Sequence, residues 1–318
     1  MISTHLSLSL NNIGCGSEKL LKIRYLIFKL STHLSLSLLR EDKRRFGMKD
    51  KSELFALSCA HLSLSLHSDK WATAMRLREP ILYKEFMACI LHIETSTEIC
   101  SVALSQDGTS LFQKTNREGM QAATLLAPYV EEALSFADSH AIPVDAVAVS
   151  EGPGSYTGLR IGVSTAKGVC YGRGIPMIAL PTLQVMCVPV LLYEDLPDDA
   201  LLCPMIDARR MEVYSAVYDR ALRPVRPVGA DIVDEQTYAE LLDKGCPVYF
   251  FGNGSDKCRE VITHPNAHFL ENIHPEARFM FPLAEKAMAL GRFVPEVAYF
   301  EPFYLKEFQA TKAKSLLT

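Results

Sequence analysis

The chain has 318 residues, 48% hydrophobic and 22% charged, with a formal net charge of −4, a composition typical of a soluble globular protein with one or two domains. It has no run of about 18 apolar residues, which excludes a membrane-spanning helix of ordinary length. The nine cysteines show neither CxxC pairs nor Cys/His ligand spacing. They therefore predict free thiols in a reducing cytoplasm, not a disulfide framework or a zinc site.

Residues 1–86 differ from the rest of the chain. The hexapeptide His-Leu-Ser-Leu-Ser-Leu occurs three times, at residues 5–10, 33–38 and 61–66. Such a repeat could indicate a solenoid, yet the segments between the copies do not resemble one another, as a continuous solenoid core would require. We therefore predict an unrelated extension, either disordered or a translated upstream repeat, ahead of a true start at Met87.

Charge also separates these two parts of the sequence. Residues 1–86 hold 14 basic and 8 acidic side chains, which leaves 19 basic and 29 acidic side chains in the remainder. Nucleic-acid affinity comes largely from cationic contacts to phosphates. A body with a net charge of −10 is a poor autonomous binder of RNA, so any RNA role would need a basic partner.

From Met87 onward the hydrophobic pattern predicts an α/β lobe. Asp107-Gly108 is a typical two-residue hairpin turn, so a meander of three strands precedes alternating helices and strands. Pro128 should kink the first helix or lie near its first turn. The predicted elements are the strands Cys89–Glu94, Cys100–Ser105 and Ser110–Thr115, the helix Gln121–Ala137, the strand Ala146–Val149, the helix Gly158–Tyr171 and the strand Met177–Leu180.

A second lobe follows the acidic loop at Leu196–Asp199. Its predicted elements are the strands Leu201–Ile206, Glu212–Tyr218 and Val248–Phe251 and the helix Phe281–Leu290. A repeated meander followed by alternating elements indicates an α/β fold with two lobes, the duplicated ribonuclease-H-like architecture of actin-like proteins, with mixed sheets flanked by helices. We place the N-terminal lobe at 87–194 and the C-terminal lobe at 195–318, whose last helix could pack back on the first lobe.

The most informative segment is the glycine loop within residues 150–162. Gly152 and Gly154 allow tight turns, Pro153 fixes φ between them, and Ser155 or Thr157 can cap the following helix. A strand that ends in such a loop at a helix N-terminus is a natural site for an anion or a partner. The loop lacks the Gly-Lys-Ser/Thr of a Walker A motif, and a structural βα turn stays an open alternative.

Four segments together resemble the TsaB (YeaZ) family of tRNA threonylcarbamoyladenosine biosynthesis proteins, in the actin-like (ASKHA) superfamily. They are Ile93-Glu-Thr-Ser-Thr-Glu-Ile-Cys-Ser-Val-Ala-Leu104, Gly152-Pro-Gly-Ser-Tyr-Thr-Gly-Leu-Arg-Ile-Gly162, Ile206-Asp-Ala-Arg-Arg-Met-Glu-Val-Tyr214 and Glu301-Pro-Phe-Tyr-Leu305. They follow the order of the family and span the chain from Met87 onward. Residues 1–86 have no counterpart in it.

The resemblance implies a non-catalytic partner that binds and activates TsaD during threonylcarbamoyl transfer to the adenosine beside the anticodon. The ATPase TsaE joins them, ATP and metal are expected on these partners, and tRNA is reached only through the complex. The resemblance also implies that the pairing with TsaD uses helices of the N-terminal lobe and that the chain can pair with itself through the same helices. Alternatives are an independent ATP-dependent kinase or ATPase of the superfamily and, least supported, a peptidase.

A vestigial nucleotide site is the first candidate site, comprising Glu94, Thr95, Gly152, Gly154, Ser155 and Asp207. Glu94 ends the first strand, where the superfamily resemblance places a carboxylate near the metal–nucleotide. It could hold a hydrated Mg²⁺ or belong to a loop capped by hydroxyls, and Asp207 could form a structural pair with Arg209. No metal is expected on this chain, because the stretch Glu118–Thr124 lacks the His-x-x-x-His pair by which TsaD is recognised.

A partner interface is the second candidate site. Gly158, Gly162 and Ala166 fall at i, i+4 and i+8, so these small side chains share one helix face that another backbone could approach closely. Packing against the chain's own sheet is the competing interpretation, and the resemblance favours the interface. The expected set comprises Leu125, Tyr129, Leu134, Gly158, Arg160, Gly162 and Ala166.

Overall fold

In the computed structural model, residues 88–119 and 121–306 are described, and all of them belong to one compact unit. The expectation for residues 1–86 lies outside this range. None of the helices between residues 88 and 306, apart from the undescribed position 120, combines the length and apolar character that a bilayer crossing needs.

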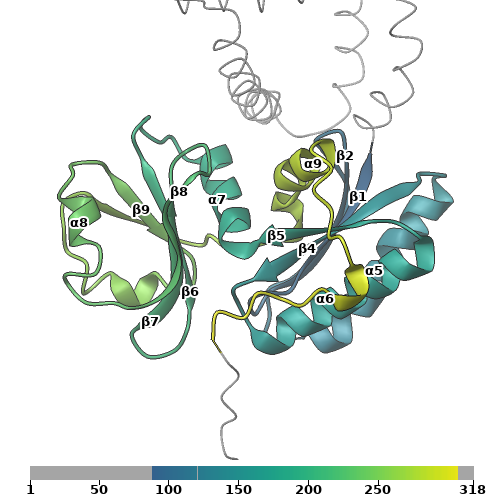
Figure 1. Ribbon diagram of the computed structural model, residues 1–318, viewed down its shortest axis with the longest axis horizontal. Helices are drawn as coiled ribbons and strands as arrows, with labels where there is room; N and C mark the ends of the chain where they lie inside the picture. The colour runs from purple at the N-terminus through teal and green to yellow at the C-terminus, as the bar shows by residue number, and fades with distance from the viewer. Residues whose placement is uncertain (1–87, 120, 307–318) are drawn as a thin grey trace, which may run out of the picture. The chain divides into compact units, whose positions relative to one another are not determined.

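The first sheet has five strands in the order β3-β2-β1-β4-β5 (Figure 1). The three N-terminal strands form an antiparallel meander, and β4 and β5 add in parallel to β1. Asp107 and Gly108 both have a positive φ, as the predicted two-residue turn between β2 and β3 requires. The strands are β1 (Cys89–Glu94), β2 (Cys100–Gln106), β3 (Thr109–Asn116), β4 (Val144–Gly152) and β5 (Met177–Pro181).

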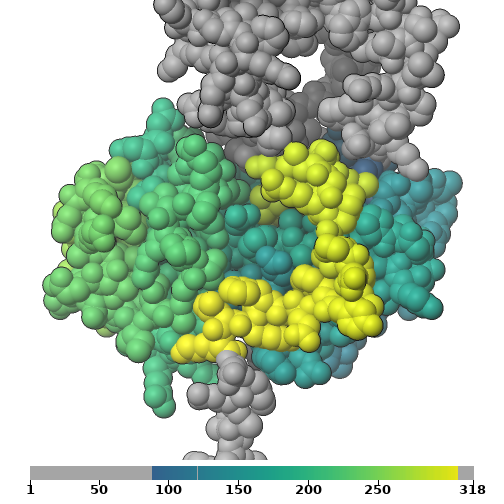
Figure 2. Space-filling view, viewed as in Figure 1, coloured from purple at the N-terminus to yellow at the C-terminus, as the bar shows by residue number. Residues whose placement is uncertain are grey.

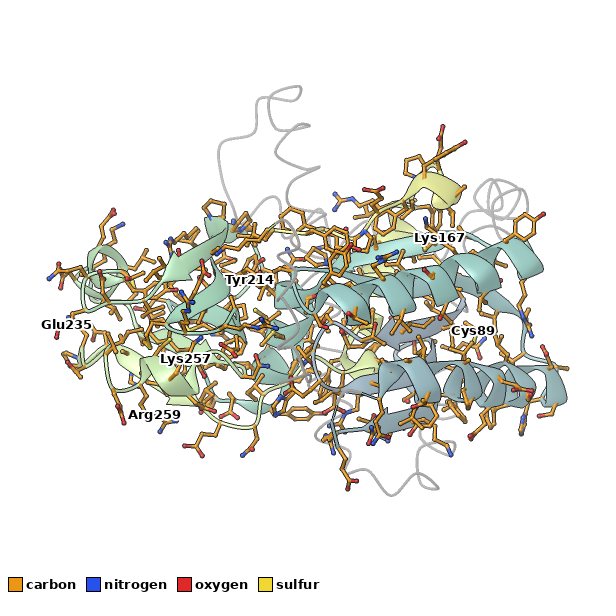
Figure 3. The ribbon with its side chains drawn as sticks, turned by 90° about the horizontal axis from the view of Figure 1, so that it is seen from below. Cys89, Lys167, Tyr214, Glu235, Lys257 and Arg259 are labelled. Carbon is orange, nitrogen blue, oxygen red and sulfur yellow. The ribbon has the colours of Figure 1, made fainter. Side chains whose placement is uncertain are left out.

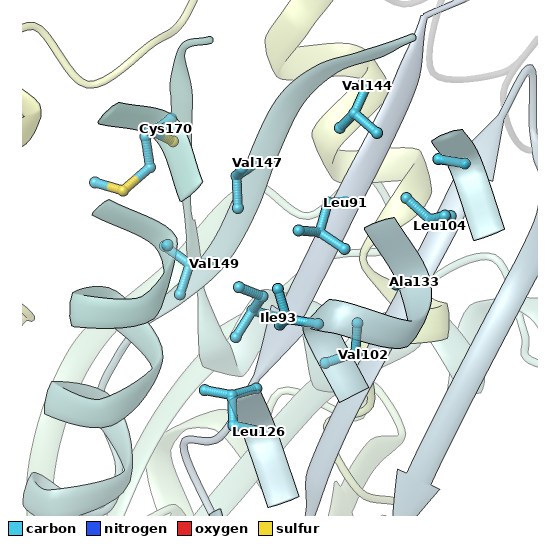
Figure 4. Packing of buried hydrophobic residues seen from close by; sticks show 14 of the residues in the cluster. Leu91, Ile93, Val102, Leu104, Leu126, Ala133, Val144, Val147, Val149 and Cys170 are labelled. Atoms are coloured by element: carbon cyan, nitrogen blue, oxygen red, sulfur yellow. The ribbon is translucent and has the colours of Figure 1, made fainter. Parts of the chain in front are cut away.

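Two helices, α5 (Ala122–Ser139) and α6 (Tyr156–Arg173), cover one face of this sheet. Strand side chains alternate between faces, and Leu91 and Ile93 of β1 point into the core beneath these helices. There they pack with residues such as Leu126 and Ala133 of α5 (Figure 4). Pro128 lies inside α5.

The opposite face of the sheet meets α7 (Thr182–Tyr193), η3 (Ala277–Phe279) and α9 (Phe281–Ala289). His92 of β1 is fully buried on this side, with its Nε2 2.7 Å from Ser105 Oγ, and burial lowers the pKa of its imidazole to about 3.

Helix α9 is fastened to the β2–β3 turn by one carboxyl group. Glu285 Oε1 accepts the N–H of Gly108 at 2.7 Å. Burial, with the nearby charge of Asp107, raises the pKa of Glu285 to about 7.

The second sheet repeats the strand order of the first. Its order β10-β9-β6-β7-β8, read from β8, is again an antiparallel meander with two strands added in parallel. One face packs on α7 and the other on α8 (Ala239–Leu242) and η2 (Asp256–Cys258). The strands are β6 (Leu201–Asp207), β7 (Glu212–Tyr218), β8 (Pro224–Ile232), β9 (Val248–Phe251) and β10 (Ala267–Leu270). The predicted duplicated α/β architecture is confirmed.

The sequence did not predict α7, β8 or β10. Nine of the 12 residues of α7 are buried, because it packs on β4 and β5 of the first sheet and on β6 of the second. A helix surrounded in this way is apolar on all sides, and no amphipathic period remains to reveal it. Strand β4 is also longer than predicted and continues to Gly152, inside the glycine loop.

Residues 298–306, here called the C-terminal strap, begin within the short helix η4 (Val297–Tyr299) and return to the glycine loop. Lys167 Nζ of α6 donates to the carbonyl oxygen of Ala298 at 2.8 Å (Figure 3). Phe303 N–H donates to the carbonyl oxygen of Glu151 at 2.7 Å, and Lys306 pairs with Glu212 of β7. The yellow C-terminal segment accordingly lies across the first sheet's helices and reaches the green second half (Figure 2).

Candidate functional site

The glycine loop after β4 is closely packed by the chain's own backbone. Gly152 has a φ of 118°, which residues with a Cβ rarely adopt, and a Cβ there would lie 2.6 Å from the carbonyl oxygen of Phe303. A Cβ on Gly154 would lie 2.2 Å from the carbonyl oxygen of Ser96. Both glycines are therefore required by close approaches within this chain.

Ser155 connects the loop to α6 as the sequence predicted. Its Oγ accepts the N–H of Gly158 at 3.3 Å and caps the helix. Its own N–H donates to the carbonyl oxygen of Ser96 at 2.7 Å. One N–H that could have met a phosphate is thus bonded to the β1–β2 connection.

Glu94 ends β1 and is fully buried. Its Oε1 accepts the N–H of Ser96 at 2.7 Å and the Oγ–H of Ser150 at 2.9 Å, while its Oε2 has no hydrogen-bond partner in the described part of the chain. Burial raises the pKa of this carboxyl, and the hydrogen bonds from Ser96 and Ser150 oppose the rise. Thr95 Oγ1 donates to the carbonyl oxygen of Gly158 at 2.8 Å. These contacts are those of the capped-loop alternative.

Asp207 lies at the end of β6 in the second sheet. Its N–H donates to Asn253 Oδ1 at 3.0 Å, and Asn253 Nδ2 donates to Glu98 Oε2 at 3.0 Å. Asn253 therefore links Asp207 to the β1–β2 connection, which begins directly after Glu94. The expected pair of Asp207 with Arg209 exists, but the backbone N–H of Arg209 makes it, at 3.0 Å, and not its guanidinium.

Metal ligands are not gathered in the described ranges. Across residues 88–119 and 121–306, no three His, Cys, Asp or Glu side chains lie close enough together to hold a metal ion. The cysteines of these ranges are free thiols, as predicted. Burial raises the pKa of Cys89, Cys100 and Cys170 to about 11, so these thiols stay protonated at neutral pH.

The row of small residues on α6 faces the chain's own sheet. Gly158, Gly162 and Ala166 are buried. A Cβ on Gly158 would lie 2.0 Å from the carbonyl oxygen of Thr95, and one on Gly162 would lie 2.3 Å from Thr95 Oγ1. The row therefore allows α6 to approach Thr95, the residue that directly follows β1, closely. This corrects the expectation that these three residues face another protein.

The outward face of α5 and α6 carries the other predicted interface residues. Leu125, Tyr129 and Leu134 are half-buried at the edge of the core, and Arg160 is exposed. Arg160 Nη1 donates to the Tyr156 hydroxyl at 3.3 Å, with its guanidinium 5.5 Å from the centre of that ring. Periodicity left these positions undecided between core packing and an interface, and their role in an interface stays a prediction.

Three further residues on the outward face of α6 were not among the predicted site residues. A Cβ on Gly168 or Gly172 would meet no atom within 4 Å, and Tyr171 is 93% exposed. Glycine inside a helix costs about 1 kcal/mol relative to alanine, and at these two positions no close packing within the described chain offsets that cost. The signal was present in the sequence, since the four glycines of this helix fall in two rows and only one row can face the sheet.

The turn between β6 and β7 holds two arginines in an unusual backbone conformation. Arg209 and Arg210 have φ values of 73° and 51°, which cost a residue with a Cβ roughly 1–2 kcal/mol each. Lys257 holds the turn, with its Nζ donating to the carbonyl oxygens of Arg210 at 2.6 Å and Glu212 at 2.7 Å and pairing with Asp207. Lys257 lies in the part of the chain that contains the second sheet (Figure 3). Both arginine side chains are exposed.

Two sheets with one strand order, each an antiparallel meander extended by parallel strands and flanked by helices, define a protein of the actin-like class. The chain resembles solved structures of this architecture. A crystal structure described as an uncharacterized protein with similarity to peptidase YEAZ, from Pseudomonas aeruginosa, has a TM-score of 0.59 at 26% identity. The match covers 69% of this chain and 100% of that one.

The chain belongs to the TsaB family. It is 38% identical over 230 residues to the Escherichia coli (strain K12) protein named tRNA threonylcarbamoyladenosine biosynthesis protein TsaB, covering 70% of this chain and 96% of that relative. The Bacillus subtilis (strain 168) protein of the same name is 28% identical over 175 residues, covering 54% of this chain and 74% of the relative. Residues 121–314 also match a family described as TsaD: tRNA N6-adenosine threonylcarbamoyltransferase. The resemblance expected from the four segments is confirmed.

Proposed function

We propose that this chain acts in tRNA threonylcarbamoyladenosine biosynthesis as the non-catalytic subunit that binds and activates TsaD. The names of its relatives support the pathway. A buried, internally hydrogen-bonded Glu94 supports a role without catalysis by the chain alone. ATP and metal would then reside on TsaD and on the ATPase TsaE, tRNA would be reached through the complex, and the complex would work in the cytoplasm.

The observation that carries the proposal is the outward face of α5 and α6. Gly168 and Gly172 leave open space on it, and Tyr171 projects from it almost fully exposed. Small residues allow another helix to approach closely, and a tyrosine can anchor such a contact at low entropic cost. Leu125 and Tyr129 of α5 pack against the core and leave part of their apolar surface exposed.

A partner of like fold suits this face. The chain matches the family described by the name TsaD over residues 121–314, so two proteins of one architecture can pair helix face to helix face in a nearly two-fold manner. The same geometry would allow two copies of this chain to pair when the partner is missing.

The test is reconstitution with the full chain. Threonylcarbamoyl incorporation into tRNA is measured with purified TsaD and TsaE, with and without this protein, and we expect activity only when it is present. Equal activity without it would refute the proposal. Micromolar binding of Mg-ATP to the chain alone, measured by calorimetry, would instead favour an independent ATP-dependent enzyme.

The face itself is tested by Gly168→Leu combined with Tyr171→Ala. We expect binding to TsaD at least about tenfold weaker, or about 1.4 kcal/mol, with an unchanged circular dichroism spectrum. Ile232→Ala on β8 is the matched control, since Ile232 is 74% exposed but lies in the second sheet. Unchanged binding by the face variant would exclude this interface.

A further inference from the structure

The β6–β7 turn presents positive charge on a chain that is otherwise acidic. In the described ranges, neither the Arg209 nor the Arg210 guanidinium has an ion-pair or hydrogen-bond partner. The two carboxylates of the turn are already paired, Asp207 with Lys257 and Glu212 with Lys306. The turn with these two lysines therefore carries a net charge of about +2, by simple charge counting.

The turn is also held firmly in place. Two backbone hydrogen bonds add to the contacts of Lys257. The N–H of Ala208 donates to the carbonyl oxygen of Glu212 at 3.0 Å, and the N–H of Glu212 donates to the carbonyl oxygen of Arg209 at 3.1 Å. Glycine or asparagine would suit the positive φ values better than arginine does. The turn thus keeps two arginines, with exposed guanidinium groups, at positions where the backbone does not favour them.

We infer that Arg209 and Arg210 contact the phosphate backbone of the tRNA substrate. The inference rests on the proposed function, which brings tRNA to the complex. Guanidinium groups bind phosphate oxygens in a bidentate manner, and contacts to phosphates position a nucleic acid without reading its sequence. Two such contacts cannot overcome the acidic surface of the isolated chain, so they act once the complex supplies the remaining affinity.

The test measures RNA binding by the complex of the full chain with TsaD. The probe is an anticodon stem–loop RNA, titrated at several salt concentrations, and the variant is Arg209→Asn with Arg210→Gly. We expect the dissociation constant to rise about tenfold and the slope of log K against log salt to fall in magnitude by about 2, one for each lost phosphate contact. For a stem–loop with a scrambled loop sequence, the substitution should weaken binding by the same factor, because contacts to phosphates do not read sequence.

Three controls make the result decisive. Because asparagine and glycine accept a positive φ, the variant should melt at the same or a higher temperature than the wild type, so weaker binding cannot be attributed to unfolding. Arg209→Lys with Arg210→Lys keeps the charge and should retain most of the salt dependence. Arg220→Ala with Arg223→Ala removes two ion-paired arginines near the β7–β8 turn and should leave RNA binding unchanged.

Other outcomes would overturn the inference. Unchanged RNA affinity and salt slope in a complex that still forms would exclude the phosphate contact and leave the proposed function intact. Loss of TsaD binding by the variant, seen by size exclusion, would show that the turn docks on an acidic protein surface instead. If the wild-type chain itself fails to bind TsaD, the proposed function fails and this inference with it.

Discussion

Four glycines of α6 should respond in opposite directions to the same substitution. Gly158 and Gly162 lie against Thr95, where a Cβ would come within 2.0 Å and 2.3 Å of an oxygen. Gly168 and Gly172 would meet no atom within 4 Å. All four lie in one helix, so alanine brings the same intrinsic gain in helix propensity, about 1 kcal/mol, at each of them.

The expected magnitudes follow from these distances. Gly168→Ala and Gly172→Ala should each stabilise the chain by about 0.5–1 kcal/mol, through propensity alone. At Gly158 the colliding atom is the backbone oxygen of Thr95, so the backbone at Thr95 or helix α6 must shift. Overpacking of this kind costs about 1–3 kcal/mol and outweighs the propensity gain. At Gly162 the obstacle is a side-chain oxygen, and we expect a smaller loss.

Urea unfolding of the full chain, followed by circular dichroism, gives the free energy of unfolding of each variant. The predicted order of stability is Gly168→Ala above wild type, and wild type above Gly162→Ala and Gly158→Ala. If Gly158→Ala proves as stable as Gly168→Ala, the packing of α6 on β1 is not as described. Binding to TsaD should follow a different order. Gly168→Ala should weaken it, whereas Gly162→Ala should leave it unchanged as long as the variant folds.

Three further substitutions test titratable side chains that are wholly or partly shielded from solvent. Burial raises the pKa of Glu285 to about 7, so the stability that its bound proton contributes is lost as the pH rises from about 4.5 to 7. Glu285→Gln should not show this loss of about 1–3 kcal/mol in the free energy of unfolding. If the urea midpoints of the wild type and of Glu285→Gln shift equally between pH 5 and pH 8, this prediction is wrong. Burial lowers the pKa of His92 to about 3, so stability is lost as the pH falls below about 6.5, and His92→Gln should lose about 2 kcal/mol less between pH 7 and pH 5. Lys257→Met removes a cation held by two carbonyl oxygens and should cost about 1–3 kcal/mol in the same assay; a change below about 0.5 kcal/mol would argue against its role.

Periodicity predicted the elements that have one apolar face and one polar face. Helices α5 and α6 alternate between core and solvent, so periodicity was enough to predict them. Strands β1 and β2 are buried on both faces and were predicted from short apolar runs and from the Asp107-Gly108 turn that separates β2 from β3. Helix α7 was missed because burial on all sides removes that alternation. The fold class was still predicted correctly without α7, since the repeated strand pattern is enough to indicate it.

The candidate site was less accessible to sequence reasoning. Spacing shows that Gly158, Gly162 and Ala166 share a face, but it does not show whether that face meets β1 or another protein. The link from Asp207 through Asn253 to Glu98, and the return of Phe303 to Glu151, join residues far apart in the chain. Contacts of this kind depend on the completed fold, so no local pattern reveals them.

The C-terminal strap has a consequence for the order of assembly. Its hydrogen bond from Phe303 to Glu151 closes a stretch of about 150 residues, and the entropy of closing a loop grows with its length. Strand pairing within the meander closes only short loops and should precede it. The strap should therefore dock late during folding and detach early during unfolding. The amide of Phe303 is then expected to exchange its hydrogen faster than the amides of β1, although both are hydrogen-bonded in the folded protein.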